Sequence, residues 1–308
     1  MKKKVIIDCD PGIDDAVALL LALGSAELEI VAITAAGGNI APEVGFKNIC
    51  RILEHLQHKK WPPLGQGLPA AAQIPGAQEI HGSDGLGNSH LPLTKTPAPR
   101  SAPELIIKTI ERNPGQISII ATAPLTNIAG ALRLKASVAE EIEDLVIMGG
   151  AIEVAGNVSP RAEFNIFMNP QAAREVFLSG AKITLLPLDV TQKVIFTPEH
   201  LERIRQSEGP AAALLSRIIP HSFKTHAQFE GIRGCYLHDA LAVAARVRPS
   251  LFKTRRLFVD VETRGELTRG MTVADLRHRS RTQPNMDVVV EVDAEGFLEF
   301  LIQRLSLS

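Results

Sequence analysis

Near its start the chain reads Val5-Ile6-Ile7-Asp8-Cys9-Asp10-Pro11-Gly12-Ile13-Asp14-Asp15-Ala16. The run from Val5 to Ile7 has the composition of a buried strand, and residues 16–23 follow as an apolar helix that ends at Gly24. Four aspartates therefore lie where a strand gives way to a helix. Carboxylates this close raise each other's pKa values, whereas a divalent metal reverses that cost. The stretch predicts a cation site at the carboxyl end of the first strand.

The alternation of strand and helix continues outward from this stretch. A second β-rich run covers residues 28–34, ends at Ala35-Ala36-Gly37-Gly38-Asn39, and is followed by helical spacing over residues 44–56. Later helices are expected at 102–112, 125–134, 170–179 and 294–306, and later strands at 117–121, 144–148, 182–186 and 287–292. We predict an α/β fold: an open, mostly parallel, Rossmann-like sheet flanked by helices, with a more helical C-terminal part from residue 198.

No internal repeat, low-complexity tract or convincing linker divides the sequence, so residues 1–308 are expected to form a single domain. A boundary near Pro187 is the alternative, because the second half is more helical. Residues 57–100 are rich in Pro and Gly and are expected to form a long loop over a functional edge. That edge would be the carboxyl ends of the parallel strands, where Thr122 and Gly149-Gly150 directly follow predicted strands.

The composition indicates a small-molecule partner. The net charge of -1, with 45% hydrophobic and 22% charged residues, gives no reason to expect a nucleic-acid or membrane surface. Three widely spaced cysteines argue against a disulfide framework and for a reducing compartment. The basic start resembles a signal peptide, but Asp8 and Asp10 interrupt the apolar run behind it. We therefore expect a cytoplasmic protein.

The acidic residues also have an ordinary structural interpretation. Aspartates at the start of a helix often cap it, but capping accounts for one or two of them, not four. Hard oxygen ligands favour Ca²⁺ or Mg²⁺ over Zn²⁺. His238-Asp239, taken alone, is typical of a core histidine beside a helix cap. Together with the first cluster, Asp239 would add a carboxylate for the ion and His238 a titratable acid.

Polar residues also follow the strand that ends at Met148. Glu163 and Asn165 are two apart, so in an extended chain they face the same way, and Asn157 precedes them in the same loop. Ordinary turn chemistry is the alternative for these residues and for His81. A sugar, however, requires this mixture of donors and acceptors. No P-loop lysine or Gly-x-Gly-x-x-Gly follows the first strand, so nucleotide-cofactor chemistry is disfavoured.

The first motif resembles the N-terminal Asp-x-Asp-Pro-Gly-x-Asp-Asp-Ala signature of the nucleoside hydrolases, the inosine-uridine-preferring ribohydrolase family. The similarity covers essentially the whole chain, and further matches follow in order at 38–39, 81–87, 122–127, 148–150, 156–157, 162–165, 238–239 and 268–273. It implies hydrolysis of the N-glycosidic bond of a ribonucleoside to free base and ribose, in purine or pyrimidine salvage. It also implies one tightly held Ca²⁺ and a homodimer or homotetramer.

The resemblance further implies roles for single residues. Asp10, Asp15 and Asp239 would bind Ca²⁺ through carboxylates and Thr122 through its backbone carbonyl, and Asp10 would be the general base for a Ca²⁺-bound water. Met148 would line the ribose pocket, and His238 would assist the departing base. The ribose hydroxyls would be held by Asp14, Asn39, Asn157, Glu163 and Asn165.

The base pocket is less defined by the sequence. With one Trp and one Tyr in the chain, a double-Trp sandwich around a purine cannot be built. His81 and Phe229 are candidates for substrate contact, and Phe223 and His226 are further aromatic candidates near the base, with helix core packing as the alternative. The chain departs from the family pattern at Ala123, where a Gly is common, and at Asn169, where an Asp is usual.

Two other functions fit parts of the sequence. A phosphohydrolase of the haloacid dehalogenase type also opens with a strand and Asp-x-Asp and uses Mg²⁺, but it requires Thr or Val at the position of Gly12. A non-catalytic, metal-dependent nucleoside- or sugar-binding protein would keep the metal site. The presence of both Asp10 and His238 argues for catalysis, because binding alone requires neither a base nor an acid.

Overall fold

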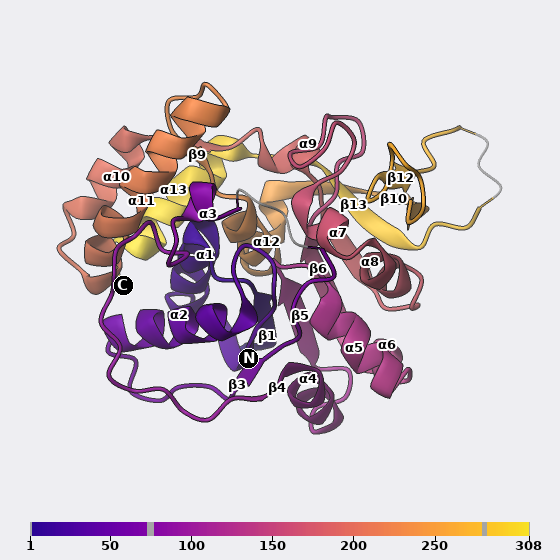
Figure 1. The fold of residues 1–308 in the computed structure, drawn as a ribbon, viewed down its shortest axis with the longest axis horizontal. Helices are drawn as coiled ribbons and strands as arrows, with labels where there is room; N and C mark the ends of the chain where they lie inside the picture. The colour runs from indigo at the N-terminus through magenta and orange to yellow at the C-terminus, as the bar shows by residue number, and fades with distance from the viewer. Residues whose placement is uncertain (1, 73–76, 279–281, 308) are drawn as a thin grey trace.

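The computed structural model describes residues 2–72, 77–278 and 282–307, and its centre is a nine-stranded sheet (Figure 1). The strands lie in the order β10-β13-β7-β6-β5-β1-β2-β3-β4, and every neighbouring pair is parallel except β10 with β13. The predicted open, mostly parallel α/β sheet is therefore confirmed. Its strands are β1 (Lys3–Cys9), β2 (Leu28–Ala35), β3 (Leu64–Gln66), β4 (Arg100–Ser101), β5 (Ile117–Ala121), β6 (Ile142–Met148), β7 (Ile183–Leu186), β10 (Phe252–Leu257) and β13 (Met286–Val292).

Helices cover both faces of the sheet, because the side chains of each strand alternate between two separate cores. Val5 and Ile7 of β1 point into the core under α1, α2, α11, α12 and α13, whereas Ile6 points into the core under α4, α5 and α8. The helices are α1 (Ile13–Leu23), α2 (Pro42–His55), α3 (Ala77–His81), α4 (Ala102–Glu111), α5 (Thr126–Leu134), α6 (Val138–Glu141), α7 (Phe164–Met168), α8 (Pro170–Phe177), α9 (Leu188–Thr191), α10 (Pro198–Arg205), α11 (Pro210–Phe229), α12 (His238–Val247) and α13 (Ala294–Leu305).

The prediction of one long loop over residues 57–100 is wrong in part. β3 lies inside this segment and pairs with β2, α3 also lies inside it, and β4 begins at its last residue, Arg100. A strand of three residues is too short to produce a recognisable alternation, and its place is decided by the free edge of β2. Two small antiparallel pairs also lie outside the main sheet, β8 (Ile195–Phe196) with β9 (Cys235–Tyr236) and β11 (Val259–Val261) with β12 (Thr272–Ala274).

The sheet order reverses beside β1, and this point positions the site. From β1 the chain continues outward through β2 and β3, then returns to place β5 on the opposite side of β1. Asp8 pairs with Ala121 at the carboxyl ends of the two strands, so Asp10 and Thr122 emerge side by side. Crevices at such reversal points are the usual ligand sites of open parallel sheets. None of the helices in the described ranges is long and apolar enough to cross a membrane.

Candidate active site

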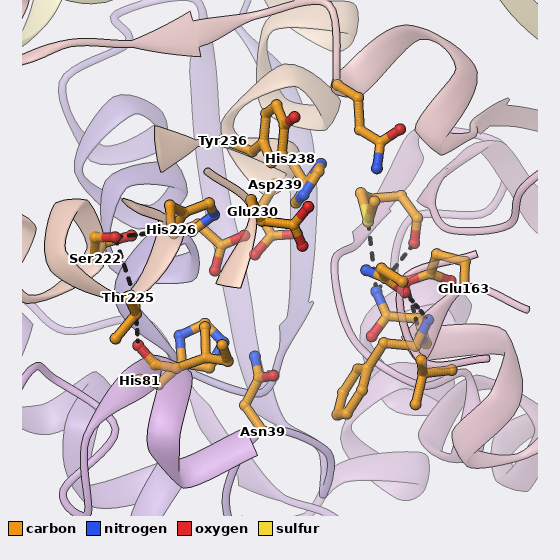
Figure 2. Close-up of a pocket in the computed structure, with 18 of the residues that line it drawn as sticks. Asn39, His81, Glu163, Ser222, Thr225, His226, Glu230, Tyr236, His238 and Asp239 are labelled. Carbon is orange, nitrogen blue, oxygen red and sulfur yellow. Dashed lines mark hydrogen bonds between the residues drawn. The ribbon is translucent and has the colours of Figure 1, made fainter. Parts of the chain in front are cut away.

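A cavity of about 360 Å³ opens above the carboxyl ends of these strands (Figure 2). It receives side chains from α1, α3, α7, α11 and α12 and from the loops between them. The catalytic, metal-binding and substrate-binding residues predicted from the sequence line it, except Asp10 and Asp15, which are fully buried, and the aromatic candidate Phe223. The lining therefore includes Asp14, Asn39, His81, Thr122, Met148, Asn157, Glu163, Asn165, Phe229, His238 and Asp239.

An acidic cluster forms the floor of this cavity. Carboxylate oxygens of Asp14, Asp15 and Asp239 all lie within 4.8 Å of one another. The first two come from the start of α1, and Asp239 comes from the start of α12, more than two hundred residues later in the chain. The packing of α1 against α12 brings them together. Three carboxylates at this spacing are able to hold a metal ion.

Fixed donors surround part of this cluster. Asp15 accepts from the backbone N–H of Gly12 at 3.0 Å and from the Thr122 hydroxyl at 2.8 Å, so the capping interpretation applies to this aspartate. One oxygen of Asp10 accepts from the backbone N–H of Asn39 at 2.5 Å. A Cβ atom at Gly38 would lie 1.9 Å from that oxygen, so only glycine permits this approach.

Other oxygens of the cluster remain without a partner. The Oδ1 atoms of Asp10 and Asp14 are buried and have no hydrogen-bond partner among the described residues. Burial and the charge of Asp14 raise the pKa of Asp15 to about 7. Burial, followed by neighbouring carboxylates, holds the pKa values of Asp10 and Asp239 well above their ordinary range. A hard divalent cation would bind the unpaired buried oxygens and compensate the excess negative charge of this cluster.

Asp8 does not belong to this cluster, which corrects the expectation that all four aspartates converge. Its Oδ1 accepts from the Thr34 hydroxyl at 2.6 Å and from the Asn127 amide at 2.8 Å, on the face of the sheet covered by α5. Asp8 is two residues after Ile6, so the alternation of β1 directs both to that face. Asp8 therefore links β1, β2 and α5 beneath the site.

A second wall is built around α7. Glu163 precedes this helix and accepts from the backbone N–H groups of Gly150, Asn165 and Ile166. The side-chain amide of Asn165 donates to the carbonyl oxygens of Thr122 at 3.1 Å and Met148 at 3.2 Å. Glu163 and Asn165 do share the cavity, but the argument from an extended chain is wrong, because Asn165 lies within the helix.

The opposite wall carries three imidazoles and a phenol. Figure 2 shows His81, His226, Tyr236 and His238 across the cavity from Glu163. The ring centroid of Tyr236 lies 5.6 Å from that of His226 and 5.2 Å from that of His238. Burial lowers the pKa of His238 to about 4, and its Nδ1 lies 2.8 Å from the Thr191 hydroxyl. The ring of His238 is therefore neutral and fixed at one nitrogen.

Several lining residues were not singled out from the sequence. Ser222 and Thr225 lie on the same face of α11 as the predicted candidates His226 and Phe229, and this helical spacing from two candidates is the signal that could have found them. Of the aromatic candidates, His226 and Phe229 line the cavity. Phe223 instead stacks on Phe196 in the core, with 6.2 Å between ring centroids. Gln192 had no recognisable signal in the sequence.

Fold and cavity together define an α/β enzyme that acts on a small polar molecule. The chain belongs to the family described as inosine-uridine preferring nucleoside hydrolase, whose model matches residues 5–299. It is therefore a ribonucleoside hydrolase, which cleaves an N-glycosidic bond, and the haloacid dehalogenase interpretation is excluded.

Individual relatives resemble the chain over nearly their whole length. It is 38% identical over 308 residues to the pyrimidine-specific ribonucleoside hydrolase RihA of Salmonella paratyphi B, with 99% of each chain covered. Among solved structures, a plant nucleoside hydrolase, PpNRh1, has a TM-score of 0.94 at 33% identity with full coverage of both chains. A purine-preferring ribonucleoside hydrolase from Gardnerella vaginalis has a TM-score of 0.93 at 34% identity, covering 99% and 98% of the two chains.

Proposed function

We propose that this cavity hydrolyses ribonucleosides with the help of one Ca²⁺, using Asp10 as general base and His238 on the side of the departing base. The observation that carries the proposal is the convergence of Asp14, Asp15 and Asp239 from two distant segments opposite a wall of imidazoles. Negative charge at the floor favours the positive charge that develops on the ribose ring as its C–N bond breaks.

The residues present suit a hard cation. Asp10, Asp15 and Asp239 would hold Ca²⁺ through carboxylates, and Thr122 would add its carbonyl oxygen. The Oδ1 atom of Asp10, buried without a partner among the described residues, supports this assignment. When bound, the ion would lower the pKa of the attacking water and bind the ribose hydroxyls.

Asp10 is suited to take the proton from the attacking water. The Asn39 N–H fixes its Oδ2 atom, and the second oxygen remains available to accept. A carboxylate held by one oxygen keeps a constant orientation toward the reacting centre, which removes part of the entropic cost of proton transfer.

The wall around α7 would position the ribose. Asp14, Asn39, Asn157, Glu163 and Asn165 all line the cavity and offer both donors and acceptors to hydroxyl groups. The carboxylate of Glu163 is held by backbone amides, and Oδ1 of Asp14 has no partner in the part of the chain that the structure describes. Groups held in advance need no reorganisation when charge develops on the sugar.

The imidazole wall would receive the nucleobase. His238 is neutral, so it would assist the departing base through an N–H hydrogen bond that strengthens as negative charge grows on the base. His81 and Phe229 line the same side of the cavity. The names of the relatives disagree about the base, since one is pyrimidine-specific and another purine-preferring.

Three further points belong to the same proposal. Residues 1–308 would form one domain, because β10 and β13 from the C-terminal part extend the sheet built by the N-terminal part. A cytoplasmic location agrees with the free, buried state of Cys9, Cys50 and Cys235. The functional unit would be a homodimer or homotetramer, as the family resemblance implies.

The test is release of reducing sugar from inosine, uridine, cytidine and adenosine and from their 2′-deoxy forms. We expect the ribosides to be cleaved and the 2′-deoxy forms to react weakly, because they lack one hydroxyl of the proposed metal contact. Equal rates on both sugars would contradict a role of the ribose diol. Binding of ligand without turnover over hours would instead support a non-catalytic protein.

A further inference from the structure

The base side of the cavity contains hydrogen-bonding groups whose polarity is set by the protein itself. His81 and His226 both line the cavity, the first from α3 and the second from α11. A neutral imidazole carries one proton on one of its two nitrogens, and the partner of one nitrogen decides the state of the other. Their neighbours can therefore be used to assign donor and acceptor.

His81 is a hydrogen-bond donor toward the cavity. Its Nδ1 lies 3.1 Å from the backbone N–H of Ile13, which can only donate, so Nδ1 must have its lone pair free. The same contact requires a neutral ring, and burial, which lowers the pKa of His81, acts in the same direction. The single proton is consequently on Nε2. A Cβ atom at Gly12 would lie 2.6 Å from Nδ1, so the glycine at the start of α1 permits this contact.

His226 has the opposite polarity. Its Nδ1 lies 2.9 Å from the carbonyl oxygen of Ser222, one turn earlier in α11. A carbonyl oxygen has no proton to give, so Nδ1 donates, and in the neutral form of the ring the lone pair is on Nε2. The Ser222 hydroxyl, 3.2 Å from the same nitrogen, is compatible as a second acceptor. No hydrogen bond to another described residue occupies Nε2 of His226, and the edge-on contact with Tyr236 restrains the ring.

We propose that His226 determines base specificity by accepting, at Nε2, a hydrogen bond from an N–H group of the nucleobase, while Nε2–H of His81 donates to a carbonyl oxygen or ring nitrogen of the same base. This inference rests on the proposed function. It assigns the substrates to ribonucleosides whose base has an unsubstituted N–H. In uridine that group is N3–H alone, and in inosine it is N1–H alone, so each of these substrates offers a single group to test.

The kinetic experiment compares kcat/KM for uridine with N3-methyluridine and for inosine with 1-methylinosine. For the native enzyme, we expect kcat/KM to be about 10- to 100-fold lower for the methylated nucleoside than for its unmethylated partner. The methyl group removes the N–H donor and leaves the lone pair of the imidazole without a hydrogen bond. His226→Leu removes the acceptor, so the unmethylated substrate should slow and the ratio should approach one. His226→Gln should retain part of the discrimination, because its amide oxygen can accept.

His221→Leu is the matched control, since it makes the same substitution on the same helix at a residue outside the cavity lining. It should keep the ratio of the native enzyme. If native enzyme cleaves methylated and unmethylated nucleosides equally, or if His226→Leu keeps the native ratio, the specificity role of His226 is overturned.

A second measurement is independent of turnover. In the free protein labelled with ¹⁵N-histidine, long-range ¹H–¹⁵N NMR spectra distinguish the two neutral tautomers. The signals that disappear in His226→Leu and in His81→Leu assign the two residues. We expect His226 to carry its proton on Nδ1 and His81 on Nε2. A proton on Nε2 of His226 would overturn the inference whatever the kinetics. Absence of ribose release from all four nucleosides would instead reject the proposed function.

Discussion

The hydroxyl of Thr191 lies 2.8 Å from Nδ1 of His238, and Thr191 is fully buried. Among the described residues, Nδ1 is the one acceptor that the hydroxyl reaches, so the threonine donates and Nε2 of His238 holds the proton. Thr191 thus orients a donor toward the base, although it is not itself part of the cavity lining.

Thr191→Val should therefore lower kcat/KM for inosine and uridine by about 10-fold, a fraction of the ~10²–10⁴-fold that general acid assistance typically supplies. p-Nitrophenyl riboside should be cleaved at nearly the native rate, because its leaving group needs little help. Thr191→Ser should retain most activity on all three substrates. Thr109→Val is the control, since that buried hydroxyl donates to the carbonyl oxygen of Leu105, its one partner among the described residues and part of α4. Equal losses on nucleosides and on the nitrophenyl compound would reject the orienting role.

Asp10→Asn should abolish hydrolysis, because an amide cannot accept the proton of the attacking water. The same substitution should raise the melting temperature of the chelated protein, since it removes one of several mutually repelling buried carboxylates. Release of reducing sugar checks the first effect, and differential scanning calorimetry with and without Ca²⁺ checks the second. The gain should shrink or reverse when Ca²⁺ is present, and a variant that is less stable under both conditions would contradict the repulsion argument.

Chelation with EDTA should inactivate the enzyme and lower its melting temperature, because a ligand that binds only the folded state stabilises it by mass action. Re-addition of Ca²⁺ should restore both properties. Restoration by Mg²⁺ but not by Ca²⁺ would show that the proposed ion is wrong. Full activity after exhaustive chelation would remove the metal from the mechanism altogether.

Asp8→Asn should differ clearly from Asp10→Asn, although the two residues are separated by one position. Asp8 contacts Thr34 and Asn127 rather than the cavity, so we expect kcat to stay within about 10-fold of the native value. The substitution should mainly lower the free energy of unfolding, by about 1 kcal/mol, because one buried hydrogen bond is rearranged. A loss of activity as complete as that of Asp10→Asn would place Asp8 in the catalytic machinery.

The sequence predicted the sheet well, because the periodicity of its longer strands and helices is a local signal. Strand β1 and helix α1 follow from hydrophobic periodicity. The acidic floor depends on tertiary packing, and the order of the family motifs, not a local pattern, linked Asp15 with Asp239. The observed cluster of three carboxylates contains Asp14 rather than Asp10. The face of the sheet toward which each aspartate points was harder to predict. The alternation that sends Asp8 to the far face was readable from Ile6 and Ile7, but four nearby aspartates suggested a single cluster.

The sequence predicted the imidazole wall less completely than the rest of the site, because the residues of this wall meet only through tertiary packing. Helical spacing groups Ser222 and Thr225 on one face of α11, but only the packing of that helix against α1 and α3 places this face at the cavity. Gln192 and Thr191 depend likewise on the position of α9. Short elements such as β3 carry too few residues for a periodic signal, so their placement depends on an available sheet edge.

The two outer strands of the sheet limit how copies of this protein can associate. At one border β4 contributes only two residues, and at the other β10 presents a row of exposed charged side chains that includes Lys253, Arg255 and Arg256. Short or charged borders discourage another chain from adding a strand, which is how natural proteins avoid fibrous aggregation. We therefore expect any assembly of this hydrolase to form through helices and loops. No backbone hydrogen bonds between strands of different subunits should form.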